Sequence, residues 1–393
     1  MAEGSVVISP RGIDRLRSGH LWIYRSDVRS ANAEAGAVVR LTDERGRFQG
    51  RAFYSDKSQI AIRLLTREDV PIDRAFFTER IRNAAAYRKI VVENTDAFRL
   101  VYGEADHLPS LVVDSYGDYL VVQTLSQSTE RLKDLFVQIL LELFSPKGIL
   151  ERNDPKVRLL EGLERSVSVL QGEVPEEVMA KENGISFVYD LRGGQKTGSF
   201  LDQRENHLAA RRYASGEVLD CFSYNGGFAL TVAGHCEHVE ATDMAPAAIA
   251  AARRNQEVNA ISNVAISNVT FREGNSFDIL KEYDDVGRKF QMVILDPPAF
   301  AKNRESIAAA QRGYKEINLR ALKLLKPGGF LLTCSCSYHI PEALFLQILA
   351  EAAVDARRSV VVVDRRTQAQ DHPILLTMPE THYLKCLVVR VLE

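Results

Sequence analysis

The spacing of apolar and polar residues divides the chain into three segments. Short apolar runs at regular intervals over residues 1–75 predict the strands of a small β-barrel. Residues 76–177 mix helical periodicity with apolar strands, which predicts a central α/β domain. Over residues 178–393 apolar strands alternate with amphipathic helices, which predicts a third domain built on a doubly wound sheet. We therefore expect three domains with these boundaries.

The first segment is expected to hold one short helix, over residues 10–18, and several strands, including 6–8, 37–41, 50–54 and 60–64. Residues 1–75 carry thirteen Arg or Lys against ten Asp or Glu, a surplus of three. A solvated surface accounts for this surplus. The alternative is a phosphate-contacting face formed by Arg11, Arg15, Arg17, Arg25 and Arg29. The single tryptophan, Trp22, is expected in the core rather than as a base-stacking platform.

The central segment shows no catalytic constellation. Its pattern predicts two helices, over residues 76–91 and 130–144. Three strands are expected over residues 111–114, 119–124 and 148–152, and the first two are joined by a hairpin turn at residues 115–118. Glu104, Asp106 and His107 lie close together, but a turn before a strand explains them without a metal.

In the third segment, polar residues stand directly after several apolar strands. The strands are expected over residues 217–220, 239–242, 269–273, 291–295, 329–333, 360–363 and 383–391. In a doubly wound sheet, ligands bind outside the carboxyl ends of the strands, where the strand order reverses. The polar residues at such ends should therefore share one site, and they are Asp220, Asp243, Asn275, Asp296 and Cys336.

The stretch from Glu217 to Asp243 has the order strand, glycine turn, helix, strand, acid that is typical of a nucleotide-binding βαβ unit. Its turn, Cys221–Gly227 (CFSYNGG), is not the G-x-G-x-x-G of dinucleotide enzymes, so a cofactor without phosphates fits better. S-adenosylmethionine (SAM) offers an amino group to Asp220 and ribose hydroxyls to Asp243. Its adenine would lie near Asn275.

A glycine-rich segment, Gly193–Arg204 (GGQKTGSFLDQR), precedes that turn. It lacks the glycine spacing and the terminal Gly-Lys-Ser/Thr of a phosphate loop. We interpret it as a lid over a cofactor bound at the next turn, with Asp202 as the N-cap of the following helix. Upstream, Asn183-Gly184 between apolar runs predicts a type I′ hairpin turn.

Composition narrows the class of protein. With 393 residues, of which 46% are hydrophobic, the chain has the make-up of an ordinary globular protein. A net charge of −2 carries no whole-molecule signal for a polyanion, so any contact with nucleic acid must be local. Five scattered cysteines favour a reducing compartment. The sequence shows neither a signal-peptide pattern nor an apolar run of about 18 residues, so we expect a soluble protein of the cytoplasm.

Several longer motifs resemble one family nearly from end to end. They are KTGSFLDQR, LDCFSYNGGFAL, DPPAF, LLTCSCS and DHPILLTMPETHYLKC. The chain is similar to the bacterial SAM-dependent 23S rRNA methyltransferases of the large subunit methyltransferase I family, which methylate cytosine at C5. The resemblance implies an RNA-binding PUA-like β-barrel at 1–75 and a central α/β domain at 76–177. At 178–393 it implies a Rossmann-like class I methyltransferase domain with a seven-stranded mixed sheet.

Cys334 and Cys336 form a C-x-C pair, but no matching C-x-C or paired histidines appear elsewhere, so no metal site is expected. The resemblance also implies a cofactor site. It places SAM against the lid, the glycine turn and the strand ends, with contacts from Phe200, Gln203, Arg204, Asp220, Phe222, Ser223, Tyr224, Asn225, Gly226, Gly227, Asp243, Asn275, Ser276, Phe277, Asp296 and Pro297.

The same resemblance assigns the nucleophile to Cys336. C5 of cytosine is a poor nucleophile, so a thiolate first adds at C6, C5 then takes up the methyl group, and a base removes the C5 proton before the thiol leaves. Asp296 would hydrogen-bond to the pyrimidine edge. Strand alternation puts Cys334 and Cys336 on one face, so periodicity alone does not choose between them. Related enzymes often carry a second cysteine where this chain has Pro298, which leaves the identity of the base open.

Two other functions stay open at this stage. Asp-Pro-Pro also occurs in enzymes that methylate the exocyclic amines of adenine or guanine. In those enzymes an aromatic residue follows directly, whereas here Ala299 precedes Phe300. The other function is a non-catalytic, SAM-sensing RNA-binding protein. The expected partner is 23S rRNA, with a homodimer as a further option, and the modified nucleotide does not follow from the sequence.

Overall fold

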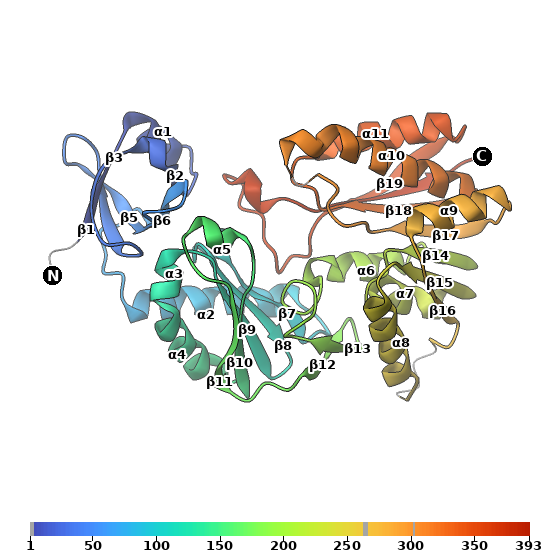
Figure 1. Ribbon diagram of the computed structural model, residues 1–393, viewed down its shortest axis with the longest axis horizontal. Coiled ribbons are helices and arrows are strands. Elements are labelled where there is room, and N and C mark those ends of the chain that lie inside the picture. The colour runs from blue at the N-terminus through green and yellow to red at the C-terminus, as the bar shows by residue number, and fades with distance from the viewer. Residues whose placement is uncertain (1–3, 262–265, 302) are drawn as a thin grey trace. The chain divides into compact units, whose positions relative to one another are not determined.

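The computed structural model describes residues 4–261, 266–301 and 303–393 (Figure 1). The chain forms two compact units. Unit 1 comprises Met1–Ala180, Tyr189–Leu201 and Gln370–Thr381. Unit 2 comprises Lys181–Val188, Asp202–Ala369 and His382–Glu393. Segments that are far apart in the sequence therefore belong to the same unit.

The N-terminal part of unit 1 is a mixed sheet with the strand order β2-β6-β5-β4-β1-β3. Along β1 the apolar residues Val6 and Ile8 are fully buried, as the alternation of side chains in a strand requires. Helix α1 (Pro10–Arg17) is capped by Ser9, whose Oγ accepts a hydrogen bond from the Gly12 N–H. These elements confirm the expected strands and helix. The strands are β1 (Gly4–Ile8), β2 (Trp22–Tyr24), β3 (Val28–Asn32), β4 (Val38–Thr42), β5 (Phe48–Tyr54) and β6 (Ile60–Thr66).

Most basic residues of this sheet already have partners. Arg11 Nε lies 2.6 Å from an oxygen of Asp27, and Arg29 Nε lies 2.9 Å from Glu44. Arg25 donates to the carbonyl oxygens of Ser55 and Ser58. This pairing favours a solvated surface as the explanation of the basic surplus. Trp22 was expected in the core, but it is only partly buried and packs against the core of the sheet.

The central part of unit 1 is a second mixed sheet, with the order β11-β10-β9-β8-β7. The expected hairpin joins β8 to β9, which pair antiparallel. The single helix expected over 130–144 is wrong at its start. Ser126 and Thr129 form a reciprocal capping box that starts a separate short helix, and Leu132 leaves helical geometry at φ −97° and ψ 7°. The elements are β7 (Ala97–Tyr102), β8 (Leu111–Tyr116), β9 (Tyr119–Thr124), β10 (Gly148–Asn153), β11 (Ser166–Gly172), α2 (Arg74–Val91), α3 (Gln127–Arg131), α4 (Lys133–Phe144) and α5 (Val157–Leu160).

The polar residues ahead of β8 have structural partners, which confirms their interpretation as a turn. Glu104 accepts a hydrogen bond from Trp22 Nε1 at 2.9 Å, and Asp106 accepts one from Arg88. His107 ends the short 3-10 turn η2 (Gly103–Asp106) in a left-handed conformation, with φ 56°.

The glycine-rich segment is anchored within unit 1 up to Leu201. Thr197 Oγ1 donates to Asp114 Oδ2 at 2.6 Å and shares a 3.1 Å hydrogen bond with the Tyr116 hydroxyl. The expected N-cap at Asp202 is wrong. Asp202 lies in the 3-10 turn η3 (Leu201–Gln203), where its carboxylate accepts a hydrogen bond from the Tyr383 hydroxyl instead of capping a helix. Helix α6 (Arg204–Ala210) begins two residues later.

The expected hairpin turn at Asn183-Gly184 is confirmed. The two residues join β12 (Glu177–Glu182) to β13 (Ile185–Asp190), and both have positive φ, 52° and 83°. A type I′ turn requires positive φ at both central positions, which asparagine and glycine adopt at low cost.

Unit 2 is built on a mixed sheet with the order β16-β15-β14-β17-β18-β20-β19, seven strands within the described residues. Helices α9, α10 and α11 pack together on one face of the sheet, and α6, α7 and α8 lie on the other (Figure 1). The strands from β16 to β18 run parallel, and β20 is antiparallel to its neighbours. The Rossmann-like sheet expected from the sequence is confirmed. Its elements are β14 (Glu217–Cys221), α7 (Gly227–Val232), β15 (His238–Asp243), α8 (Pro246–Ile261), β16 (Val269–Glu273), α9 (Ser276–Asp285), β17 (Phe290–Leu295), α10 (Ile307–Leu324), β18 (Leu325–Ser335), α11 (Glu342–Asp355), β19 (Val360–Arg366) and β20 (Lys385–Val391).

Candidate functional site

The predicted site residues of unit 2 gather at one edge of its sheet. Cys221, at the end of β14, pairs with Thr242 of β15 on one side and with Leu295 of β17 on the other. Leu295 in turn pairs with Thr333 of β18. Because these strands are parallel, the residues that follow them lie at the same edge. The strand order reverses between β14 and β17, which is where ligands bind in such sheets.

The glycine turn after β14 is held in a strained backbone conformation. Phe222 and Tyr224 have positive φ, 66° and 47°, which non-glycine residues rarely adopt. Two hydrogen bonds fix the turn to the end of β15: the Ser223 N–H donates to the Thr242 carbonyl at 2.9 Å, and the Tyr224 N–H donates to Asp243 Oδ2 at 3.0 Å. Strain maintained by such anchors is typical of a ligand-binding loop.

Gly227, the first residue of α7, is required by close packing. A Cβ at this position would lie 2.5 Å from Cε1 of His207. His207 is buried, and its Nδ1 shares a 2.6 Å hydrogen bond with Glu182. The backbone of the turn therefore packs directly on a histidine ring, which leaves no space for any side chain at position 227.

Asp220 places a buried carboxyl group beneath this turn. Its side chain is 0% exposed, and Oδ2 accepts a hydrogen bond from the Ala229 N–H at 3.0 Å. Among the described residues, Oδ1 has no hydrogen-bond partner. Burial, together with the charges of Asp296 and Asp243, raises the pKa of Asp220 well above its usual range. A cluster of three carboxylates around one unpaired oxygen favours a cationic ligand.

Two serines add hydroxyl groups without partners to the same edge. Among the described residues, the buried Oγ atoms of Ser223 and Ser276 have no hydrogen-bond partner. Asn275 is committed to the backbone, because its Oδ1 accepts the Phe277 N–H at 2.9 Å as the N-cap of α9. The unpaired oxygens fit SAM, which carries an ammonium group, a sulfonium centre and ribose hydroxyls.

Asp296, directly after β17, is positioned by neighbouring amides. Gln203 Nε2 donates to Asp296 Oδ1 at 2.8 Å, and Gln203 Oε1 accepts from Asn206 Nδ2 at 2.7 Å. Asp296 is partly exposed, and its backbone N–H donates to the Cys221 carbonyl at 3.4 Å. Gln203 thus links Asp296 to Asn206, and its contact with the cofactor stays a prediction.

Two predicted cofactor residues have neighbouring side chains as partners. Phe200 belongs to unit 1, where Lys196 Nζ lies 4.6 Å from the centre of its ring. Arg204 is buried, with Nη2 3.2 Å from Glu205. Phe222, Asn225, Gly226, Phe277 and Pro297 follow the strands of unit 2 at the edge.

The two cysteines at the end of β18 differ sharply in environment. Cys334 is 0% exposed, and burial, with Cys386 and Asp296 as further causes, raises the pKa of its thiol. Cys336 follows the last residue of β18, is partly exposed, and its Sγ lies 4.0 Å from the Pro297 carbonyl oxygen. A reactive thiol must be ionisable and accessible, so the structure favours Cys336 where periodicity left both open.

Three residues around Cys336 were absent from the sequence prediction. The Tyr314 hydroxyl bonds to Oγ of Ser337 at 2.9 Å, and Ser337 Oγ also accepts the Ala301 N–H at 3.1 Å. Lys385 Nζ donates to the Ser337 carbonyl at 2.7 Å. For Lys385, the sequence offered one signal: a lysine at the start of an apolar strand, in the motif LKCLVV.

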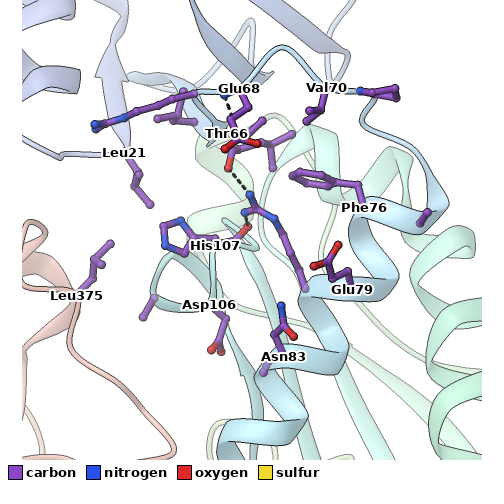
Figure 2. A pocket seen from close by; sticks show the side chains of 18 of the residues that line it. Leu21, Thr66, Glu68, Val70, Phe76, Glu79, Asn83, Asp106, His107 and Leu375 are labelled. Atoms are coloured by element: carbon purple, nitrogen blue, oxygen red, sulfur yellow. Dashed lines mark hydrogen bonds between the residues drawn. The ribbon is translucent and has the colours of Figure 1, made fainter.

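A pocket of about 930 Å³ lies in unit 1 between β6 and α2 (Figure 2). Its wall combines apolar side chains such as Phe76 and Val70 with acidic and basic ones, including Glu79 and His107. Burial, followed by the charge of Arg80, lowers the pKa of His107. None of the predicted site residues lines this pocket.

Within the described ranges, no group of three or more His, Cys, Asp or Glu is arranged to hold a metal ion. In the same ranges no helix is both long and apolar enough to cross a membrane.

The chain matches two family models. A PUA-like domain matches residues 6–67, and an S-adenosylmethionine-dependent methyltransferase matches residues 162–390. The second match covers more than half of the chain and includes Asp220, Asp243 and Asp296. The Rossmann-like sheet and its site therefore define a SAM-dependent methyltransferase.

Curated relatives narrow this class. The ribosomal RNA large subunit methyltransferase I of Tolumonas auensis is 40% identical over 382 residues, 95% of this chain and 96% of its own. That of Vibrio cholerae is 40% identical over 390 residues, 97% of this chain and 98% of its own. The chain belongs to the ribosomal RNA large subunit methyltransferase I family.

Solved structures agree on the fold. A structure of SMU.776, a methyltransferase complexed with SAH, superposes with a TM-score of 0.84 at 21% identity, covering 98% of this chain and 100% of its own. A SAM-dependent methyltransferase from Streptococcus mutans has a TM-score of 0.82 at 21% identity, with the same coverage.

Proposed function

We propose that this enzyme methylates C5 of a cytosine in large-subunit ribosomal RNA through a covalent adduct with Cys336. The observation that carries the proposal is the position of Cys336. Its partly exposed thiol stands 4.0 Å from the carbonyl of Pro297, next to Asp296, at the edge that holds the acid cluster. The relatives that match this chain over nearly its full length are named ribosomal RNA large subunit methyltransferase I.

The residues that would hold SAM are the acids and hydroxyls of the glycine-turn edge. Asp220 has the unpaired buried oxygen for an ammonium group, and Asp243 stands at the strand end suited to the ribose hydroxyls. Ser223 and Ser276 offer two further unpaired hydroxyl groups. When bound, SAM supplies an electrophilic methyl group on a positively charged sulfur.

Cys336 acts on the pyrimidine. Its thiolate adds to C6, forming an S–C6 bond and moving the electron pair of the C5–C6 double bond onto C5. After C5 has gained the methyl group, a base removes the C5 proton, the double bond re-forms, and the S–C6 bond breaks to return the thiolate. Asp296, fixed by Gln203, would hydrogen-bond the pyrimidine edge and hold the ring in register with the thiol.

The decisive test compares two cysteine variants of the full chain. Cys336→Ala should reduce methyl transfer to large-subunit RNA by at least about a thousandfold while SAM affinity stays within about twofold. The matched control is Cys236→Ala, because Cys236 is a partly buried thiol that donates to the Val232 carbonyl. This variant should keep wild-type turnover.

The product identifies the reaction. Mass mapping of RNA treated with SAM and the wild-type enzyme should locate the methyl group on a cytosine carbon. Turnover by Cys336→Ala that equals wild type, or a methyl group on an exocyclic amine, would contradict covalent catalysis and support the amine alternative.

RNA recognition is proposed to involve the PUA-like sheet, within a three-domain division at residues 1–75, 76–177 and 178–393. Binding of ribosomal RNA should weaken as salt rises, because phosphate contacts release counterions. An affinity that does not change with salt would contradict that role. We further propose a cytoplasmic enzyme, and sedimentation velocity will decide between a monomer and a homodimer.

A further inference from the structure

Tyr314 is a buried tyrosine whose hydroxyl group meets the end of β18. It lies in the middle of α10 and is 0% exposed. The centre of its ring lies 4.6 Å from that of Phe300 and 5.5 Å from that of Phe345. A phenylalanine would also fill such an aromatic site, and burying a hydroxyl group is unfavourable unless it is hydrogen-bonded. The partners of the hydroxyl group therefore indicate what a tyrosine contributes here.

The Tyr314 hydroxyl connects the two residues on either side of Cys336. It accepts a hydrogen bond from Ser335 Oγ at 3.0 Å and shares one with Ser337 Oγ at 2.9 Å. Both serines are fully buried. Burial raises the pKa of Tyr314, so its hydroxyl stays protonated near pH 7 and is able to donate to Ser337 while it accepts from Ser335. One side chain of α10 thus holds the chain before and after the thiol.

Ser337 extends this connection to the loop that follows β17. Its Oγ accepts the Ala301 N–H at 3.1 Å, and Ala301 ends the segment of residues 296–301 that begins with Asp296. The backbone beside Cys336 and the loop that carries Asp296 are therefore joined by hydrogen bonds. We call this group the serine–tyrosine clamp, and its members are Tyr314, Ser335, Ser337 and Ala301.

The clamp acts through the backbone. Side chains alternate along a strand, so Ser335 and Ser337 point toward α10 and Cys336 points to the other face. On that other face Cys336 Sγ lies 4.0 Å from the carbonyl oxygen of Pro297. The clamp thus leaves the thiol accessible and fixes the residues next to it.

The proposed reaction requires such a connection between two strands. Cys336 follows β18 and Asp296 follows β17, and these strands are parallel neighbours. The sulfur has to reach C6 while the acid holds the edge of the same pyrimidine ring. A displacement of about 1 Å between reacting groups is able to cost about 100-fold in rate. The relative position of the two loops therefore matters as much as the identity of the two side chains.

We propose that Tyr314 is a positioning residue whose hydroxyl group holds the Cys336 thiol in register with the loop that carries Asp296. The inference rests on the proposed role of Cys336 and deepens it. The clamp orders both loops before RNA binds, so this ordering does not have to occur during the reaction. Loss of the hydroxyl should slow the addition of the thiolate to C6. SAM binding should change little, because the glycine turn is anchored to β15 rather than to α10.

The first test measures the clamp itself, without RNA or SAM. Hydrogen–deuterium exchange of the full-length protein is followed by peptide mass spectrometry for the wild type and for Tyr314→Phe, which keeps the aromatic ring. Peptides that cover residues 296–301 and 335–338 should exchange at least about fivefold faster in the variant, as expected when a buried hydrogen bond is lost. Unchanged exchange in both peptides overturns the proposal.

The second test measures methyl transfer to large-subunit ribosomal RNA. Tyr314→Phe should lower kcat by roughly 10- to 100-fold, while the KM for RNA and the SAM affinity stay within about twofold. Turnover is expressed per SAM-binding site, so that a loss of folded protein does not count as a loss of rate. A kcat equal to that of the wild type on this scale would show that Tyr314 has only a structural role.

Tyr283→Phe is the matched control. Tyr283 is also buried, and its hydroxyl donates to Glu240. The centre of its ring lies 5.8 Å from that of Phe290, the first residue of β17 and therefore at the opposite end of this strand from Asp296. Both variants lose a buried hydrogen bond, so both should lower the melting temperature by a few degrees. Only Tyr314→Phe should lower kcat, and an equal loss of kcat in both would contradict the proposal.

Ser337→Ala removes the shared partner and leaves Tyr314 in place. It should lower kcat as Tyr314→Phe does. The double variant should lie within about twofold of the slower single variant, because both substitutions break the same connection. A double variant whose loss equals the product of the two single losses would show independent effects and exclude the clamp.

The two proposals fail in different experiments. Methyl transfer by Cys336→Ala would remove covalent catalysis, whereas faster exchange in Tyr314→Phe would still establish the clamp. Conversely, an inactive Cys336→Ala variant beside a Tyr314→Phe variant with wild-type kcat would leave the nucleophile in place and exclude Tyr314 as its positioning residue.

Discussion

At the scale of single residues, the three acids of the site differ mainly in burial. Asp220 is fully buried with an unpaired oxygen, whereas Asp243 and Asp296 are partly exposed and accept hydrogen bonds from the protein. All three could be identified in the sequence from their places at strand ends. The differences in burial among the three acids could not be predicted from the sequence, because burial depends on residues from other elements.

Asp220 should make SAM binding depend on pH. Burial raises its pKa above the unfolded value of about 3.9, so the ligand-free fold loses stability as pH rises through the folded pKa and the carboxyl ionises unpaired. A bound cation favours the ionised form. SAM affinity should therefore rise with pH over this range, and binding should release a proton, measurable by calorimetry in buffers of different ionisation enthalpy.

The variant Asp220→Asn keeps the shape of the side chain and removes its charge. SAM affinity should fall roughly 10- to 100-fold above the folded pKa, through loss of a charged hydrogen bond, and proton release should disappear. Proton release that persists in this variant would assign the titration to another group.

Asp243 is expected to bind the ribose of SAM and also to hold the glycine turn in place. Asp243→Ala should weaken SAM binding by roughly 1–3 kcal/mol, because the variant loses charged hydrogen bonds that include those from the Tyr224 and Ala245 N–H groups. The control Asp285→Ala removes an exposed acid at the end of α9 and should leave the titration unchanged. Equal SAM affinity in both variants would contradict a ribose contact.

At the scale of elements, the glycine turn depends on a contact that no local pattern reveals. Gly227→Ala would place a Cβ 2.5 Å from His207 Cε1, displacing the ring that bonds to Glu182. Overpacking of this kind costs roughly 1–3 kcal/mol of unfolding free energy. We expect a lower melting temperature and weaker SAM binding.

Gly234 provides the matched control, because a Cβ there meets nothing within 4 Å. Gly234→Ala should leave stability and SAM affinity near wild type. Equal melting temperatures for the two alanine variants would show that the His207 ring moves aside at little cost.

At the scale of the whole molecule, the chain returns to unit 1 after most of unit 2 has been completed. Gln370–Thr381 belongs to unit 1, although it lies between β19 and β20 in the sequence. Arg88 holds this segment. The guanidinium is 1% exposed and donates to the carbonyls of Asp371 and Arg99 and to the carboxylate of Asp106.

Removing Arg88 should therefore destabilise unit 1. Arg88→Ala leaves Asp106 without its buried ion-pair partner, a change that costs about 3–5 kcal/mol. Arg82→Ala removes an exposed arginine of the same helix and should cost no more than about 0.5 kcal/mol. Urea unfolding followed by circular dichroism measures both, and equal midpoints would show that the returning segment does not depend on this arginine.

The sequence by itself predicted the strands of unit 2 and the class of cofactor. Periodicity located the strands that end at Asp220, Asp243 and Asp296, and the turn residues indicated a ligand without phosphates, because these signals are local. Helix α10 was not part of the sequence prediction, although Ala310, Tyr314 and Ile317 form a buried stripe at helical spacing.

Only the tertiary structure decided what depends on contacts between distant segments. Burial distinguished Cys336 from Cys334, two residues that the side-chain period of a strand treats alike. Antiparallel pairing brought Lys385 beside the end of β18, about fifty residues away in the sequence. Solvent exclusion and strand register are properties of the assembled sheet, and one segment's pattern does not contain them.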